Sequence, residues 1–351
     1  MSLEEIRKDI DLIDSKILKL LNDRMELVLM AKRFKTQIQD SQREEELFNR
    51  IRRESKGLIN AEFIERIYVE VVKESKNLQE KDYKLITFQG EHGAYSEVAS
   101  REWNSDLTPV PSPEFAQVFE GVKSGLYDYG IVPVENTLGG AVDQVNRLLI
   151  NTDLSVVGAV ELPIHHCLLV VPGTDHREIR TVFSHSQALA QCRRFISRNN
   201  LDPVPYSDTA SAAKMIAEKK PKGSAAIASK LAAQLYDLEI IKDGIEDLDR
   251  NITRFLVLTR EENQEDGDKC SIIFSTEHKA GTLFRVLEVF AKRDINLTRI
   301  ESIPNEPGNY AFFLDFIGSN KDGKIVEALD AVRKMTSYFK LMGCYKERKV
   351  A

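Results

Sequence analysis

The chain has 351 residues, more than one domain usually contains, which indicates two or three domains. It is 42% hydrophobic and 30% charged with a net charge of −6, typical of a globular protein without a basic surface for nucleic acid or an anionic membrane. It contains no apolar run of about 18 residues, and its acidic start lacks the apolar core of a signal peptide. Since Cys167, Cys192, Cys270 and Cys344 show no paired spacing, we expect a reduced, cytoplasmic protein.

The composition of the sequence changes twice along the chain, which predicts three domains. Residues 1–82 contain one glycine and no proline, which predicts long helices. Residues 83–261 alternate short apolar runs with Gly, Pro, Ser and Asn, as α/β domains do. A polar stretch, 261–269, is typical of a linker. Residues 269–347 then follow a βαββαβ order, which predicts a small ferredoxin-like α+β unit.

A charge interrupts an otherwise apolar stripe on the first predicted helix. The stripe follows a 4,3 spacing that would bury against another helix, and its members are Ile6, Ile10, Ile13, Ile17, Leu20, Arg24, Leu27, Ala31 and Phe34. Lys35 lies eleven residues beyond Arg24, which on a continuing helix is the same face. Two cations facing a helical interior suggest an anionic ligand. The alternative is that both reach water or pair with acids.

The order of polar residues over 3–79 resembles the all-helical type of chorismate mutase. The matching residues are Arg7, Arg24, Lys35, Asp40, Arg43, Glu44, Ser75 and Gln79. The resemblance implies that these residues bind chorismate in an intertwined homodimer, with Arg7 supplied by the partner. It further implies that Lys35 and Gln79 donate to the ether oxygen, and that Glu44 and the Arg43 backbone hold the hydroxyl. Independently, Arg7 and Arg24 are about 25 Å apart along a straight helix, too far for one small ligand.

The middle region offers several helix starts to an anion. Its polar turns, QGEHGAYS, ENTLGG, SHSQ and SDTAS, each follow a predicted strand, and free backbone N–H groups at helix starts bind anions. Ordinary helix capping is the alternative for each turn. No dinucleotide fingerprint or phosphate loop is present. The adjacent His165 and His166 would face opposite sides of a strand and could not share a metal; we expect His166, Cys167 and Cys192 to be buried core residues.

Five motifs in this region resemble prephenate dehydratase: GEHGAYS, VPVENTLGGA, IHHCLLV, residues 182–192 and NITRFLVL. The resemblance implies two α/β lobes, as in periplasmic ligand-binding proteins. It implies a site containing Asn136, Ser184, Gln191 and Thr253, with Arg254 and the backbone near Thr137 as further ligands of the substrate carboxylates. The family resemblance makes Thr253 the candidate proton donor to the departing hydroxyl, and His185 is the alternative if its ring points inward.

The last region resembles the ACT amino-acid-binding domain. Gly281-Thr282-Leu283 stands where that family has Gly-Ala-Leu, and Glu301-Ser302-Ile303-Pro304 stands for Glu-Ser-Arg-Pro. The resemblance implies a phenylalanine sensor with ligand contacts at Gly281, Leu283, Glu301 and Ser302. Since Ile303 replaces the arginine, a dimerisation module that has lost or retuned its ligand is the alternative.

Together these resemblances imply a bifunctional enzyme of phenylalanine biosynthesis. It would convert chorismate to prephenate and prephenate to phenylpyruvate, without a cofactor or metal, under feedback by phenylalanine. The partners expected are chorismate, prephenate, phenylalanine and a second copy of the chain. Two alternatives stay open at this point: a ligand-responsive regulatory protein, and an enzyme that retains one of the two activities.

Overall fold

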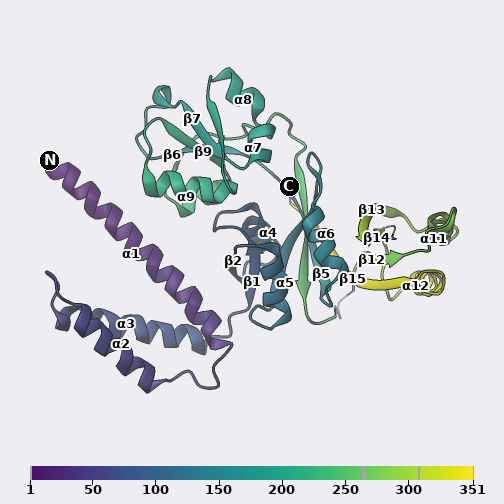
Figure 1. Ribbon diagram of the computed structural model, residues 1–351, viewed down its shortest axis with the longest axis horizontal. Helices are drawn as coiled ribbons and strands as arrows, with labels where there is room; N and C mark the ends of the chain where they lie inside the picture. The colour runs from purple at the N-terminus through teal and green to yellow at the C-terminus, as the bar shows by residue number, and fades with distance from the viewer. Residues whose placement is uncertain (1, 263–265, 307–308, 351) are drawn as a thin grey trace. The chain divides into compact units, whose positions relative to one another are not determined.

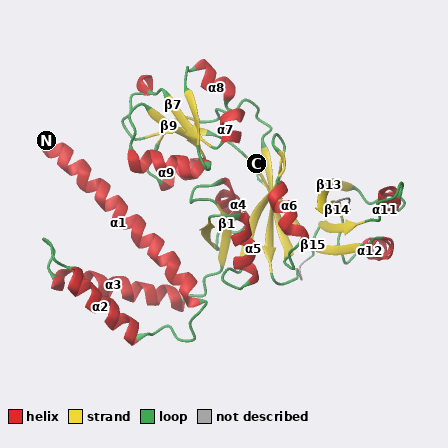
Figure 2. Cartoon of the chain, in the orientation of Figure 1, coloured by secondary structure: helices red, strands yellow, loops and turns green. Residues whose placement is uncertain are grey.

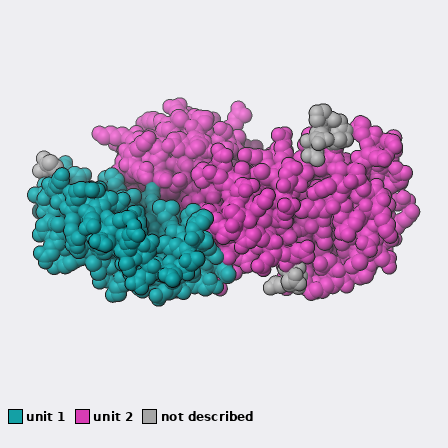
Figure 3. Space-filling view, turned by 60° about the horizontal axis from the view of Figure 1, so that its bottom comes forward, with its two compact units in different colours: residues 1–84 teal, residues 85–351 magenta. Residues whose placement is uncertain are grey.

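The computed structural model describes residues 2–262, 266–306 and 309–350. The chain forms two compact units, Met1–Lys84 and Leu85–Ala351 (Figure 3). None of the helices within these described ranges is both long and apolar enough to cross a membrane. The three parts agree with the predicted fold class: a helical region, an α/β region with two sheets, and a βαββαβ region.

The first unit is built from three helices (Figures 1 and 2), which are α1 (Leu3–Lys32), α2 (Ser41–Glu54) and α3 (Ala61–Glu80). Each begins at a residue whose side chain accepts a backbone N–H: Ser2, Asp40 and Asn60. Helix α3 packs against both α1 and α2. In this single chain the apolar stripe of α1 stays largely in solvent, because no helix of the unit covers its first half. The exposed fractions of Ile6, Ile10, Ile13, Ile17 and Leu20 are 42%, 51%, 55%, 50% and 66%.

The second unit starts with an α/β lobe whose helices α4, α5 and α6 lie against a sheet (Figure 1). Strand β1 is parallel to β2 and β3, and the returning strand β11 is antiparallel to β3 and β5. The elements are β1 (Leu85–Gln89), α4 (Tyr95–Trp103), β2 (Thr108–Ser112), α5 (Phe115–Lys123), β3 (Tyr129–Asn136), β4 (Gly140–Ala141), α6 (Asp143–Ile150), β5 (Ser155–Pro163) and β11 (Ile252–Thr259).

A second lobe is inserted between β5 and β11. Its sheet has the order β10-β6-β9-β7-β8. The elements are β6 (Cys167–Val170), η1 (His176–Glu178), β7 (Thr181–Ser184), α7 (Ser186–Gln191), α8 (Arg193–Arg198), β8 (Asp202–Pro205), α9 (Thr209–Lys219), β9 (Ser224–Ala228), α10 (Lys230–Leu235) and β10 (Glu239–Lys242). Residues 164–166 lead the chain into this lobe and residues 243–251 lead it back. These two segments are bonded to each other, Ile164 N–H to the Asn251 carbonyl and Ile245 N–H to the His166 carbonyl.

A close approach between the lobes explains Gly93 in the GEHGAYS turn. Its φ is +88°, and a Cβ there would lie 2.7 Å from Ala232 Cα on α10. The Gly93 carbonyl accepts the hydroxyl of Ser229, and Lys214 of α9 pairs with Glu91. Only a residue without a side chain fits this contact.

The C-terminal region has the predicted βαββαβ order and adds its sheet to the first lobe. Its elements are β12 (Lys269–Ser275), α11 (Thr282–Ala291), β13 (Leu297–Glu306), β14 (Asn309–Ile317), α12 (Gly323–Met335) and β15 (Tyr338–Lys349). The strand order is β13-β14-β12-β15, and β15 pairs in parallel with β5 of the first lobe. The sequence did not predict this continuous sheet. The linker predicted over 261–269 ends one residue earlier in the structure, because β12 begins at Lys269. Residues 263–265 of this linker lie outside the described residues.

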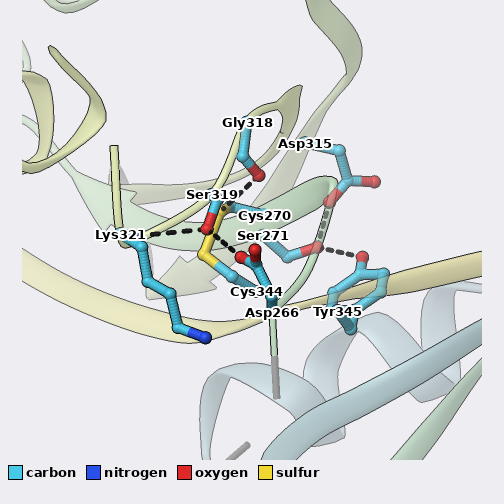
Figure 4. The surroundings of a disulfide bond; sticks show 9 residues. All are labelled: Asp266, Cys270, Ser271, Asp315, Gly318, Ser319, Lys321, Cys344 and Tyr345. Atoms are coloured by element: carbon cyan, nitrogen blue, oxygen red, sulfur yellow. Dashed lines mark hydrogen bonds between the residues drawn. A yellow bond between two sulfur atoms is a disulfide. The ribbon is translucent and has the colours of Figure 1, made fainter. Parts of the chain in front are cut away.

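The expectation of unpaired cysteines is wrong for two of the four. Cys270 and Cys344 stand opposite each other on β12 and β15 and form a disulfide (Figure 4). Because the two cysteines are 74 residues apart, the sequence did not predict this pairing, which the antiparallel register of β12 and β15 brings about. Cys167 and Cys192 are free and buried, as expected, and burial raises the pKa of the Cys167 thiol to about 12.

Candidate functional site

The helical unit brings three of its predicted site residues together. Arg24 Nη1 donates to Ser75 Oγ at 2.6 Å, which ties α1 to α3. One turn along α3, Gln79 Nε2 donates to the Val28 carbonyl at 2.8 Å. Ser75 and Gln79 are both buried. The guanidinium of Arg24 is therefore held at a polar patch inside the helical packing, and it is one of the two cations for which an anionic ligand was predicted.

Lys35, the second predicted cation, does not lie on α1, so the prediction that it shares a helix face with Arg24 is wrong. Helix α1 ends at Lys32, and tight turns follow in which the Lys35 N–H donates to the Lys32 carbonyl. Lys35 is exposed, and its spacing from Arg24 along an ideal helix therefore does not describe its position.

The predicted residues of α2 mostly contact protein groups. Asp40 Oδ1 accepts the Arg43 N–H at 3.0 Å as the helix cap, and the Arg43 side chain pairs with Glu46. Glu44 pairs with Lys76 of α3 at 2.7 Å, a residue that the sequence interpretation did not single out. Asp40 thus caps α2, and its predicted contact with chorismate stays a prediction.

Arg7 lies near the start of α1 and is exposed. Because α1 is uninterrupted from Leu3 to Lys32, the 17 residues between Arg7 and Arg24 span about 25 Å of helix. The two arginines of one chain therefore cannot contact the same small ligand.

In the second unit, Asn136 and Thr253 form a cross-strand pair at the ends of β3 and β11. Asn136 Nδ2 donates to Thr253 Oγ1 at 2.9 Å and to Asn251 Oδ1 at 2.8 Å. Its Oδ1 accepts the N–H groups of Leu138 and Gly139. Thr253 is 9% exposed, and no hydrogen bond described for it uses its own proton. This proton is available to a bound ligand.

Gln191, at the end of α7, joins the same network through a residue that the sequence interpretation missed. Asn251 Nδ2 donates to Gln191 Oε1 at 3.1 Å, so Asn251 bridges Gln191 of the second lobe to Asn136 of the first. Gln187 was also missed; its Nε2 lies 3.4 Å from Asn136 Oδ1. Both stood in motifs already noted, at the start of NITRFLVL and in SHSQ, but their side-chain directions needed the fold.

Ser184 and Thr137 are engaged by the protein itself. Ser184 is fully buried, and its hydroxyl donates to the Ile227 carbonyl at 2.6 Å. The Thr137 N–H donates to the Ile252 carbonyl and its hydroxyl to the Arg250 carbonyl. The expectation that the Thr137 backbone binds a substrate carboxylate does not fit this placement, because that N–H already has an acceptor.

Arg254 faces away from the Thr253 side of β11, because successive residues of a strand point to opposite faces. It is 3% exposed and donates to Asp315, Glu347 and the Tyr345 hydroxyl, at 2.5, 2.6 and 2.9 Å. Burial alone would lower the pKa of Arg254, but these three groups raise it. The expected substrate contact of Arg254 is therefore corrected: the C-terminal region occupies its guanidinium.

Two partners of this arginine, Asp315 and Tyr345, lie with Ser271 close to the Cys270–Cys344 disulfide (Figure 4). Ser271 hydrogen-bonds both Asp315 and Tyr345, and it follows Cys270 as Tyr345 follows Cys344. Burial would raise the pKa of Glu347, but Arg254 and Lys269 hold it below its usual range. The C-terminal region thus binds Arg254, which follows Thr253 on β11.

His185 is exposed and caps α7, where its Nδ1 accepts the Gln187 N–H at 3.3 Å. No described hydrogen bond links its ring to Thr253, Asn136 or Gln191. Its role as an alternative proton donor stays a prediction.

The C-terminal region contains a pocket lined by three of the four predicted effector residues, Gly281, Leu283 and Ser302, together with Tyr310 and Phe312 among others. Glu301 does not line it, because Glu301 and Ser302 alternate along β13. Ile303 also points away from the pocket and is 4% exposed. An arginine at this position would be buried. Among the described residues, no group of His, Cys, Asp and Glu side chains could hold a metal.

The comparisons with known proteins agree with this division. Residues 6–80 match the family Chorismate mutase type II, residues 86–263 match Prephenate dehydratase, and residues 271–334 match the ACT domain. A bifunctional chorismate mutase/prephenate dehydratase of Aquifex aeolicus is 33% identical over 98% of this chain and 97% of its own.

Other relatives match the second unit alone. Arogenate dehydratase/prephenate dehydratase 6 of Arabidopsis thaliana is 38% identical over 74% of this chain and 68% of its own length. A solved structure of prephenate dehydratase from Arthrobacter aurescens in complex with L-Phe is 29% identical, with a TM-score of 0.69 over 75% of this chain and 89% of its own. The chain belongs to the family of bifunctional chorismate mutase/prephenate dehydratases with a C-terminal ACT domain.

Proposed function

We propose that this enzyme performs two consecutive reactions at separate sites, chorismate to prephenate in the helical unit and prephenate to phenylpyruvate in the second unit. The observation that carries the proposal is the match of all three family domains in order, over nearly the full length of bifunctional relatives. The product of the first site is the substrate of the second. Neither reaction requires a cofactor.

The mutase reaction is a pericyclic rearrangement, so its site must orient a dicarboxylate and stabilise charge on the breaking ether oxygen. Arg24 suits a carboxylate because its planar guanidinium binds in bidentate fashion, and its bond to Ser75 fixes its direction. Gln79 and Lys35 are proposed donors to the ether oxygen. Glu44 is proposed to hold the hydroxyl, whereas the Arg43 N–H already donates to Asp40.

The second half of this site is proposed to come from a second copy of the chain. The exposed apolar stripe on α1 supports this, since Ile6, Ile10, Ile13 and Ile17 are 42–55% exposed in the single chain. Contiguous apolar surface of this kind marks an interface. In a two-fold dimer of α1 helices, Arg7 of one copy would reach the site around Arg24 of the other.

The dehydratase reaction expels CO2 and a hydroxyl together as the ring becomes aromatic. Hydroxide leaves slowly unless a proton or strong hydrogen bond reaches it in the transition state. We assign this role to Thr253, whose oxygen accepts from Asn136 and whose own proton is used by no described hydrogen bond. Asn136 and Gln191 are proposed to contact the substrate. Ser184 is proposed to shape the site, because its proton is already donated to Ile227.

Phenylalanine is the proposed feedback inhibitor, and the pocket at Gly281, Leu283 and Ser302 is its proposed site. The relative from Arthrobacter aurescens was solved with L-Phe, which supports this ligand. The backbone at Gly281 has φ +84° and no side chain, so a ligand can approach it closely. We propose that phenylalanine binding affects the dehydratase site through the hydrogen bonds that Arg254 donates to Asp315, Tyr345 and Glu347.

The test is to supply chorismate to the purified full chain without any cofactor and to measure prephenate and phenylpyruvate. Formation of phenylpyruvate supports both activities, and formation of prephenate alone would overturn the dehydratase proposal. Arogenate is supplied separately, because the Arabidopsis relative is named for both substrates. We propose a cytoplasmic location, in which the Cys270–Cys344 disulfide would be exposed to reductants.

A further inference from the structure

His166 lies where the chain passes from the first lobe into the second, and its ring connects the two lobes. It is 2% exposed. Its Nδ1 is 2.8 Å from the Tyr95 hydroxyl on α4, and its Nε2 is 2.9 Å from Gln191 Oε1 on α7. The sequence alone suggested a satisfied core histidine, and these contacts agree. They also give it a direct neighbour among the proposed dehydratase residues.

The direction of every hydrogen bond in this network follows from one backbone anchor. Leu138 and Gly139 donate their N–H groups to Asn136 Oδ1, at 3.1 and 2.7 Å. An amide has one accepting and one donating end, so the other end of Asn136 must be its NH2 group. This group donates to Asn251 Oδ1, and Asn251 therefore presents its own NH2 group to Gln191 Oε1.

The hydrogen bond from Asn251 to Gln191 also determines the tautomer of His166. Gln191 Oε1 already accepts from Asn251, and an oxygen cannot donate to the ring nitrogen that faces it. The hydrogen must therefore be on His166 Nε2, which donates to Gln191. The other nitrogen, Nδ1, is left to accept from the Tyr95 hydroxyl, whose proton is shared with the His165 carbonyl at 2.7 Å.

The ionisation of the two rings is consistent with this arrangement. Burial lowers the pKa of His166, so the imidazole is neutral at pH 7 and carries one hydrogen. Burial also raises the pKa of Tyr95, which keeps its hydroxyl proton in place. Glu246 fixes the backbone on the other side, since its Oε2 accepts the His166 N–H at 2.9 Å.

Two donors thus hold Gln191 Oε1, and the amide nitrogen is the end of Gln191 that remains for a ligand. In the opposite tautomer, His166 Nε2 would lack a hydrogen and would attract the NH2 group of Gln191. The amide would then turn, and it would offer an oxygen to a substrate that carries two carboxylates. An acceptor facing an anion is repulsive, so the tautomer decides whether this position binds prephenate.

We propose that His166 is a positioning residue of the dehydratase site, which as its Nε2–H tautomer orients the Gln191 amide so that its NH2 group faces the substrate. This inference rests on the proposed contact of Gln191 with prephenate. It adds a role for a residue that does not itself touch the substrate.

The first test is spectroscopic and does not depend on activity. The full chain is labelled with 15N-histidine, and the ring nitrogens of His166 are assigned by their loss in His166→Gln. We expect the Nε2–H tautomer at pH 7. Finding the Nδ1–H tautomer would overturn the proposal, whatever the enzyme does.

The second test compares two amide replacements in the purified full chain. The glutamine of His166→Gln can place an N–H near the position of Nε2, whereas the asparagine of His166→Asn is too short. Since His166 acts through Gln191, we expect His166→Asn to lower dehydratase kcat by about 10- to 100-fold, less than loss of a direct donor. His166→Gln should recover most of this loss.

The controls separate positioning from folding and from failure of the proposed function. The adjacent His165→Asn, whose exposed ring pairs with Glu246, should keep the dehydratase rate within about twofold, as surface changes usually do. Mutase activity should be unchanged in all variants. Equal losses in His166→Asn and His166→Gln would indicate a space-filling role and overturn the proposal. If the unmodified chain forms no phenylpyruvate, the function proposal fails while the tautomer measurement still decides the orientation of Gln191.

Discussion

The two proposed active sites differ in how much of each a single chain supplies. In the helical unit, Arg24 is bonded to Ser75 and Gln79 to the Val28 carbonyl. Arg7 and Lys35 are exposed, and much of the apolar stripe of α1 is uncovered. In the second unit, Asn136, Asn251, Gln191 and Thr253 form a hydrogen-bonded network that is closed within one chain. We propose that a second copy completes the first site, whereas the network of the second site comes from one chain.

This difference follows from the way each region buries apolar surface. Three helices can cover only part of one another, and a 30-residue helix such as α1 extends beyond what its neighbours cover. The second unit surrounds its sheets with helices and buries Ile86, Phe88, Ile131, Val257 and Leu169 completely. Its polar residues at the strand ends are therefore fixed by a packed interior.

Replacing Thr253 by alanine is expected to produce the largest effect. Loss of the proton-donating hydroxyl should reduce phenylpyruvate formation by about two to four powers of ten, while chorismate consumption stays nearly unchanged. The measurement is the rate of each reaction in the same preparation. Thr259→Ala is the matched control, since Thr259 is on the same strand and its hydroxyl donates to the Asp128 carbonyl instead. A parallel loss of both activities in Thr253→Ala would indicate misfolding.

Breaking the Cys270–Cys344 link should have the next largest effect, on stability. A cross-link that closes 74 residues restricts the unfolded chain, and its removal costs up to about 4 kcal/mol in the chain-entropy view. Urea unfolding of the oxidised chain, the reduced chain and Cys344→Ser gives the free energy of unfolding of each. Reduction should leave the helical unit unaffected. Equal stability of all three forms would contradict a structural disulfide.

Asp315→Asn tests whether the C-terminal region holds the strand of Thr253. Asp315→Asn removes one of two buried carboxylates that pair with Arg254 and leaves Glu347 as its partner, and we expect a loss of up to about 3 kcal/mol in the free energy of unfolding. Phenylalanine inhibition should weaken in the same variant, because Arg254 links the effector region to β11. The control is Arg348→Ala, which removes a half-exposed pair with Glu102 and should cost under about 1 kcal/mol. Unchanged inhibition in Asp315→Asn would exclude this route.

The sequence predicted the elements well and the directions of side chains poorly. The absence of helix breakers before residue 83, and the βαββαβ order after residue 269, follow from local composition, and the fold reproduces both. Arg254 was misassigned because a motif gives the order of residues and not the face of the strand, and its three acceptors come from residues 61 to 93 positions away. The prediction for Lys35 was wrong because it assumed that α1 continues to residue 35, whereas the helix ends at Lys32.

The smallest predicted effect is a partial recovery, and it tests the incomplete site directly. Arg7→Ala and Lys35→Ala homodimers should each have very little mutase activity, since every site lacks one cation. In a two-fold dimer, random exchange makes half of the dimers hybrid, and one of the two sites in each hybrid contains both intact residues. About a quarter of the wild-type mutase activity should therefore return on mixing. A mixture of Arg24→Ala with Lys35→Ala is the matched control, because these two residues belong to the same half of the site and no hybrid restores them together. Recovery in both mixtures, or in neither despite measured subunit exchange, would contradict a site that takes Arg7 from the partner and Arg24 from the same chain as Lys35.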